Sequence, residues 1–134
     1  MKGIIVASHG DLARGMENTL SMFFGEMEQI SFLSLASDED LETFLSRMTE
    51  AAAKVDSGDG TIIFTDMFGG TPNNCACRLL EKYDVVSGFN LPMLMTVLTK
   101  RLSGPINILT LIEDCKSSFV YVNEINQDIK EDEF

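Results

Sequence analysis

The only histidine among the 134 residues follows a short apolar run near the start of the sequence. His9 lies just beyond residues 3–7, whose β-branched composition predicts a strand. A neutral imidazole in such a place can act as a nucleophile through the lone pair of one ring nitrogen. A histidine can also do no more than cap or pack a turn, and His9 alone does not separate these alternatives.

An acidic residue follows a second apolar run in the same way. Asp66 comes directly after residues 61–65, and it either caps the following turn or reaches His9. If the two runs are neighbouring parallel strands, their carboxyl ends bring Asp66 close to His9. A carboxylate that accepts from one ring nitrogen leaves the lone pair of the other nitrogen free. It also stabilises the positive imidazole that forms when this lone pair attacks phosphorus.

A glycine pair and a predicted helix start follow Asp66. Gly69 and Gly70 allow the backbone to approach a ligand closely. Thr71 is predicted to cap a helix whose first position is Pro72, and the free N–H groups of a helix start favour an anion. The Thr71 hydroxyl can donate a further hydrogen bond to a phosphoryl oxygen. Because phosphoryl transfer depends mainly on positioning and electrostatics, these residues favour a phosphohistidine site that needs neither a metal nor a cofactor.

The elements that position these residues alternate between strands and helices. Nearly continuous apolar runs at 3–7 and 61–65 predict strands that are covered on both faces, as in a parallel sheet. Two further strands are expected at 30–35 and 84–89. Helical spacing follows each strand, and the alternation predicts an open, mainly parallel α/β sheet with right-handed crossovers. The expected helix N-caps are Ser37, Thr71 and Asn90, and a final helix is expected over residues 106–115.

The C-terminal part of the sequence is less regular. Residues 118–122 have strand composition, and we expect them to close an edge of this sheet or of a neighbour's. The acidic end, with Asp128, Glu131, Asp132 and Glu133, is expected to be solvated. The length fits a single domain that spans residues 1–134.

Composition narrows the classes of partner and compartment. The formal net charge of -11 argues against nucleic acid, because phosphate backbones select basic clusters. No apolar stretch approaches the roughly 20 residues of a membrane-spanning helix, and the N-terminus does not resemble a signal peptide. The three cysteines, Cys75, Cys77 and Cys115, are expected to be reduced thiols rather than a disulfide framework or a metal site, which indicates a cytoplasmic protein.

Three segments together resemble one known family. They are Ser8-His9-Gly10, the run from Asp66 to Pro72, and the run from Gly88 to Leu94. In order and approximate spacing they are similar to the mannose-type (mannose, fructose and sorbose) EIIA components of the bacterial phosphoenolpyruvate-dependent sugar phosphotransferase system. The resemblance implies a doubly wound sheet, with a C-terminal antiparallel edge strand exchanged within a homodimer.

The same resemblance implies a reaction. His9 would accept phosphate from the phosphocarrier HPr and pass it to a separate IIB component. Asp66 would orient the imidazole, and Thr71 would place its hydroxyl near the phosphoryl group, where the family often has serine. Met93, which follows the fourth expected strand, is the apolar residue that we expect to remain exposed for partner binding.

Three other functions stay open at this point. A phosphotransfer subunit of dihydroxyacetone kinase would use an equivalent histidine, although its motif after the third strand differs. A hydrolase would use Ser8 or Thr71 as nucleophile with His9 as base, although the Gly-x-Ser-x-Gly motif is absent. A regulatory domain of similar shape would not depend on His9 at all.

Overall fold

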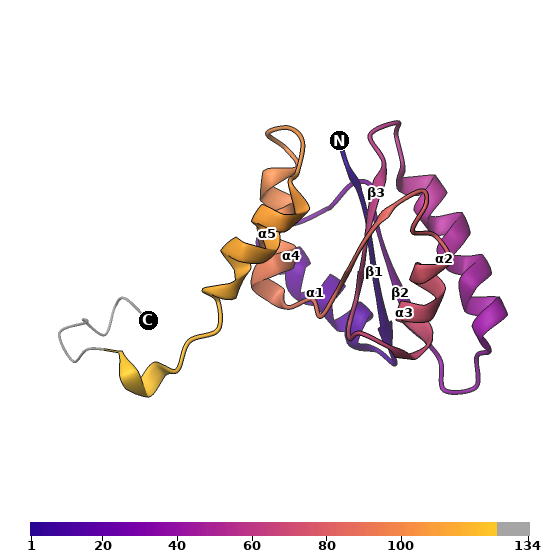
Figure 1. The fold of residues 1–134 in the computed structure, drawn as a ribbon, viewed down its shortest axis with the longest axis horizontal. Helices are drawn as coiled ribbons and strands as arrows, with labels where there is room; N and C mark the ends of the chain where they lie inside the picture. The colour runs from indigo at the N-terminus through magenta and orange to yellow at the C-terminus, as the bar shows by residue number, and fades with distance from the viewer. Residues whose placement is uncertain (126–134) are drawn as a thin grey trace.

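A computed structural model describes residues 1–125, which form a four-stranded parallel sheet between two layers of helices (Figure 1). The strand order is β2-β1-β3-β4, so β1 and β3 are central, and β2 and β4 are the edges. Within the described residues all three strand pairings are parallel. The elements in chain order are β1 Gly3–His9, α1 Leu12–Phe24, β2 Ile30–Leu35, α2 Leu41–Val55, β3 Thr61–Thr65, α3 Gly70–Cys77, β4 Asp84–Ser87, α4 Leu91–Lys100, α5 Ile108–Lys116 and the 3-10 helix η1 Val122–Glu124.

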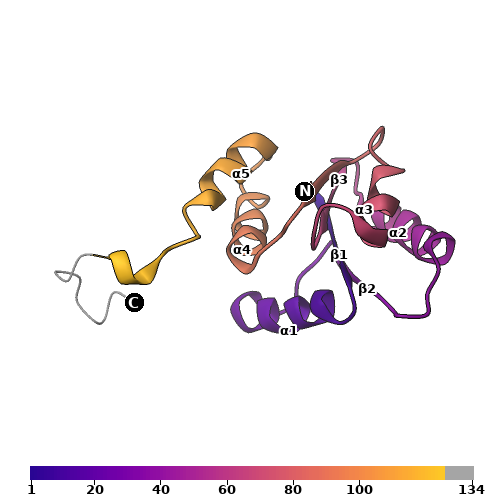
Figure 2. The ribbon, with the colours of Figure 1, turned by 60° about the horizontal axis from the view of Figure 1, so that its bottom comes forward.

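The two central strands separate two apolar layers. Successive strand residues point to opposite faces, so Ile4 and Val6 pack with the layer of α1, α4 and α5. Ile5 and Ala7 pack with the layer of α2 and α3 instead. Figure 2 shows α1 and α4 on one side of the sheet and α2 and α3 on the other. Because both faces are covered, the central strands are apolar throughout, which is the pattern that predicted a parallel sheet.

The register of the central strands determines where the polar residues at their ends lie. Ala7 pairs with Thr65, so His9 and Asp66 both follow directly at the same edge of the sheet. The Asp66 N–H donates to the Ala7 carbonyl at 3.2 Å and thereby extends the ladder by one residue. The expected juxtaposition of the first and third strands is therefore present.

Two of the expected strands have the predicted bounds, and two differ. β2 and β3 match the predicted residues, whereas β1 continues to His9. The fourth strand ends at Ser87 rather than at residue 89. The reason is that the Thr65 carbonyl accepts from the N–H groups of both Gly88 and Phe89, which turns the chain out of the sheet.

The predicted helix starts are partly right. Asn90 caps α4 as expected, because its side chain accepts from the Met93 N–H at 3.0 Å. Ser37 was the wrong N-cap for α2. Asp40 has the extended backbone of a cap and its carboxylate accepts from the Thr43 N–H at 2.7 Å, so the helix starts three residues later than expected.

The start of α3 also differs from the prediction. The helix begins at Gly70 and its N-cap is Gly69, so Thr71 lies inside the first turn and is not the cap. Gly69 has a φ of +88°, a conformation that glycine adopts without steric cost. The glycine pair therefore turns the chain into the helix two residues earlier than a threonine cap would.

The C-terminal part contains one prediction that is confirmed and one that is not confirmed. The expected helix is present as α5, which packs against α4. The strand expected at 118–122 is not confirmed, since this segment leads away from the body of the molecule in Figure 1 and η1 follows it. The predicted acidic end lies outside the described residues. Within residues 1–125, the helices are too short or too polar to cross a bilayer.

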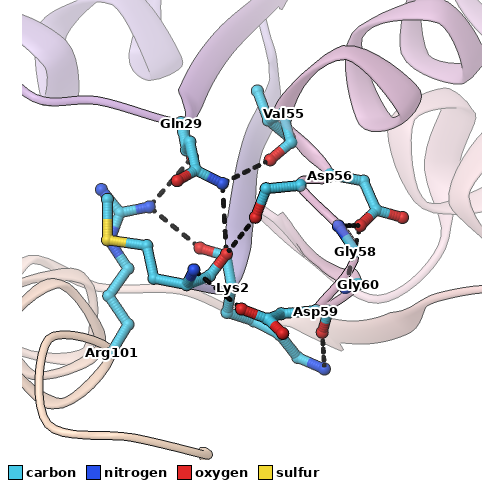
Figure 3. Close-up of polar contacts among 10 residues, drawn as sticks. Lys2, Gln29, Val55, Asp56, Gly58, Asp59, Gly60 and Arg101 are labelled. Atoms are coloured by element: carbon cyan, nitrogen blue, oxygen red, sulfur yellow. Dashed lines mark hydrogen bonds and ion pairs between the residues drawn. The ribbon is translucent and has the colours of Figure 1, made fainter.

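Side-chain hydrogen bonds link the backbone segments at the amino end of the sheet (Figure 3). Arg101 directly follows α4, and its guanidinium is buried. It donates to the carbonyls of Lys2 and Gln29 at 3.0 and 2.9 Å, and also to the carbonyl of Glu28. Burial lowers the pKa of this guanidinium from its ordinary value. Gln29 donates onward to the Val55 carbonyl at 3.0 Å. Backbone segments that precede β1, β2 and β3 are thus linked to α4 and α2 at this end.

Candidate functional site

His9 and Asp66 form a hydrogen-bonded pair at the carboxyl end of the sheet. The Nδ1 atom of His9 lies 2.9 Å from Oδ2 of Asp66, and the His9 main-chain N–H donates to the same oxygen at 3.0 Å. The Met67 N–H donates to the other oxygen, Oδ1, at 3.1 Å. The Asp66 side chain is 11% exposed and that of His9 is 44% exposed. The carboxylate is therefore sheltered and held by the backbone, whereas the ring is open to solvent.

This geometry selects one tautomer of the imidazole. An ionised carboxylate only accepts hydrogen bonds, so Nδ1 of His9 carries the proton that Asp66 receives. The lone pair of the neutral ring then lies on Nε2. A negative charge beside Nδ1 also stabilises a positive ring, so the arrangement suits a nucleophile that becomes cationic during the reaction.

The first residue of α3 lies against the free nitrogen of the ring. A Cβ atom added to Gly70 would come within 2.9 Å of Nε2 and 2.7 Å of Cε1 of His9. The φ of Gly70 is +78°, which side chains rarely adopt. Both constraints require glycine here, because any side chain would displace the ring.

The helix start beside Nε2 can bind an anion. Gly69 and Gly70 bring the first turn of α3 to the ring, and Thr71 lies half-buried in the same turn. The first N–H groups of a helix have no partner within the helix, and its dipole is positive at this end. A phosphoryl group on Nε2 would therefore develop its negative charge beside these groups.

Ser8 is not available as a nucleophile. Its side chain is fully buried, and its hydroxyl accepts from the Ala13 N–H at 2.7 Å and donates to the Gly10 carbonyl at 3.3 Å. These contacts fix the turn between β1 and α1. The hydrolase interpretation thus loses its first candidate.

The expectation that Met93 is exposed is wrong. Its side chain is only 7% exposed and packs in the core of the layer that contains α4. The cap at Asn90 directs this face of α4 towards the sheet. Exposed apolar side chains are found instead at Met67 and Phe68, which follow Asp66 directly in the chain and are 54% and 84% exposed. The sequence could have indicated their exposure, because two large apolar residues stand between the acidic residue and the glycine pair, where no strand or helix was expected.

The described cysteines are free thiols. Cys75 and Cys115 are buried and Cys77 is exposed, and burial raises the pKa of the Cys75 thiol. Among residues 1–125, no three histidine, cysteine or acidic side chains are grouped as a metal site would require.

Comparisons with known proteins agree on one family. Residues 3–110 match the family EIIA-man, described as PTS system fructose IIA component. The mannose-specific EIIAB component of Escherichia coli K12 is 32% identical over 105 residues, which cover 76% of this chain and 32% of that protein. This chain thus spans about a third of the length of that relative. The fructose-specific EIIA component of Bacillus subtilis 168 is 28% identical over 145 residues, with 99% of each chain covered.

Solved structures with the same fold include two from streptococci. The PTS IIA protein associated with the fucose utilization operon of Streptococcus pneumoniae is 32% identical, with a TM-score of 0.81 over 92% of this chain and 94% of that one. The EIIA component of Streptococcus agalactiae has a TM-score of 0.79 over 92% and 98% of the chains. Its identity is 22%, so it supports the fold alone.

Proposed function

This chain belongs to the EIIA-man family of phosphotransferase-system IIA components, and on that basis we propose that it carries a phosphoryl group on His9 during sugar uptake. The proposed donor is phosphorylated HPr, and the proposed acceptor is a separate IIB component. The observation that carries the proposal is the pairing of His9 with Asp66, which leaves Nε2 with a free lone pair on an exposed ring.

The proposed reaction needs only a displacement at phosphorus. The Nε2 lone pair of His9 attacks the phosphoryl group on the donor's histidine, so a new P–N bond forms while the donor's P–N bond breaks. The Nδ1 proton stays between the ring and Asp66, whose charge offsets the positive ring. Transfer to the acceptor is the same displacement with His9 as the leaving group.

The phosphoryl-binding residues in this proposal are Gly69, Gly70 and Thr71. Gly70 supports it through its close approach to Nε2 of His9. Backbone N–H groups of the first turn and the Thr71 hydroxyl would then donate to the phosphoryl oxygens, which carry most of the charge during transfer. The residues proposed here fit a phosphoryl group without a metal.

Both partners must reach the same ring. A single histidine accepts and donates the phosphoryl group, so the donor and the acceptor dock in turn on one surface. Met67 and Phe68 support such a surface, because large apolar side chains at 54% and 84% exposure are suited to transient protein contacts. The proposed place of action is the cytoplasm, without insertion into the membrane.

We further propose that the chain forms a homodimer through its C-terminal segment. Consecutive apolar side chains from Phe119 to Val122 are 55–75% exposed in the single chain. The edge strand β4 has one side without a strand partner in the sheet described by residues 1–125. A segment of strand composition from a second copy would cover such an edge. Light scattering coupled to size exclusion tests this, and a monomer at micromolar concentration would refute it.

Intact-mass spectrometry tests the relay. The protein is incubated with phosphoenolpyruvate, enzyme I and HPr, and we expect the added mass of one phosphoryl group, labile in acid and stable in base. Addition of a IIB protein should then remove this mass, whereas a dihydroxyacetone kinase with its bound nucleotide should not. Absence of labelling when HPr is fully phosphorylated would refute the proposal.

A further inference from the structure

A buried polar cluster lies behind the candidate site, at the carboxyl ends of β3 and β4. The hydroxyls of Thr65 and Ser87 share a hydrogen bond of 2.8 Å. Both also reach the side-chain oxygen Oδ1 of Asn73, Thr65 at 3.5 Å and Ser87 at a shorter distance. Thr65 is fully buried and Asn73 is 4% exposed. No local pattern in the sequence indicates a role for any of these three residues.

The cluster joins three elements that meet at the site. Thr65 is the last residue of β3 and directly precedes Asp66, and Ser87 is the last residue of β4. Asn73 lies in α3, three residues after Gly70, which lies so close to the imidazole that an added Cβ atom would clash with it. The hydrogen bonds to Asn73 thus link the helix beside Nε2 to the strand that carries the carboxylate.

The apolar contacts of α3 come from small side chains. Its buried residues besides Asn73 are Pro72, Cys75 and Ala76, all of them small, and the helix has eight residues. Small apolar side chains bury little area and give a helix a weak orientational preference. Hydrogen bonds at a buried side chain are directional, and leaving their partners unsatisfied is costly.

We propose that Asn73 is a positioning residue for phosphoryl transfer. It holds α3 against the carboxyl ends of β3 and β4, and thereby holds Gly70 and the first-turn N–H groups at Nε2 of His9. The proposal rests on the proposed function. Asn73 acts through α3, and its side chain is bonded to Thr65 and Ser87 rather than to the ring.

The test compares two ways of removing the cluster. Asn73→Ala removes the acceptor that Thr65 and Ser87 share, leaves these hydroxyls only their bond to each other, and frees α3 from β3 and β4. The triple variant Thr65→Val, Ser87→Ala, Asn73→Leu removes donors and acceptor together, which can restore stability because no polar group is left unpaired. Cys77→Ala is the matched control, since it removes only the weak 3.7 Å contact from the Asn73 amide to Sγ.

The measurements are urea unfolding and steady-state transfer from phosphorylated HPr, resolved into kcat and KM. We expect kcat to fall about tenfold or more in Asn73→Ala and in the triple variant, because small misplacements at a reacting centre are costly. The KM for HPr should stay unchanged, since the exposed docking residues are intact, and Cys77→Ala should behave as wild type. In the triple variant kcat should stay low although stability returns.

Three outcomes would overturn the proposal. A wild-type kcat in Asn73→Ala would do so, and so would a kcat in the triple variant that recovers together with stability. If Asn73→Ala is too unstable to assay, the triple variant decides alone. Absence of transfer to the wild-type protein would refute the proposed function and, with it, this inference. If the wild type is phosphorylated normally and one of the first two outcomes is found, only this inference is refuted.

Discussion

The two ends of the parallel sheet are built in opposite ways. At the carboxyl end, one imidazole stands 44% exposed and is held by a single carboxylate oxygen. At the amino end, the guanidinium of Arg101 is 4% exposed and donates to three backbone carbonyls from two segments of the chain. One end leaves a reactive nitrogen free, and the other end satisfies backbone groups with a buried cation.

This difference separates stability from chemistry. A group that is proposed to meet two partner proteins has to be exposed, so it contributes little to the core. At the opposite end, the buried guanidinium donates to the carbonyls of Lys2 and Glu28, and to the Gln29 carbonyl, which also accepts from the Ile4 N–H of β1. Substitutions at the two ends should therefore have nearly independent effects on transfer and on unfolding.

The largest effect is expected from His9→Gln. The variant lacks the nucleophile, so labelling by phosphorylated HPr should disappear in intact-mass spectra. Its free energy of unfolding should stay within about 0.5 kcal/mol of wild type, because the side chain is exposed. Full labelling of this variant would show that the phosphoryl group is carried elsewhere.

Arg101→Met should lower the stability and leave the transfer unchanged. Methionine replaces the aliphatic stem but removes the donor from the carbonyls of Lys2 and Glu28, and leaves the Gln29 carbonyl with the Ile4 N–H alone. We expect a loss of about 3 kcal/mol in the free energy of unfolding, measured in urea. The transfer rate per folded molecule should stay as in wild type. A rate loss comparable to the stability loss would contradict the independence of the two ends.

Asp66→Asn should slow transfer without preventing it. The amide can still accept from the backbone and from Nδ1, but it lacks the charge that stabilises a positive ring. We expect kcat to fall about a hundredfold, as for the loss of other electrostatic groups at reacting centres. Quench-flow labelling measures the rate, and unfolding in urea provides the control. An unchanged rate would mean that Asp66 serves only the turn that it caps.

The smallest expected effect concerns the free energy of unfolding at acidic pH. The backbone N–H groups of Gly58 and Gly60 each donate to Oδ1 of Asp56 at 2.9 Å. These hydrogen bonds, that of Gly58 first, lower the pKa of Asp56 below its ordinary value of 3.8. A lowered folded pKa gives stability that is present above the unfolded value and is lost as pH falls through the folded value. The stability advantage of wild type over Asp56→Ala should therefore shrink between about pH 5 and about pH 2 in urea titrations. A constant difference over this range would exclude a charge-dependent contribution.

Much of the site was predictable from the sequence because its signals are local. Apolar runs followed by a single histidine and a single acidic residue placed His9 and Asp66 at the ends of neighbouring strands, and the resemblance to mannose-type EIIA components is confirmed. The predictions that failed depend on contacts between distant residues. Met93 is buried because α4 turns this side chain towards the sheet, and the segment 118–122 pairs with no strand in the single chain.

By itself, the sequence determined the alternation of strands and helices, the parallel sheet and the proposed nucleophile, since these follow from periodicity and from residue types near strand ends. Only the tertiary structure decided which atoms of Asp66 and Gly70 touch the ring, and that Asn73 joins Thr65 and Ser87. The physical reason is that hydrogen bonds and close contacts depend on tenths of an ångström between segments distant in the chain, which no local pattern encodes.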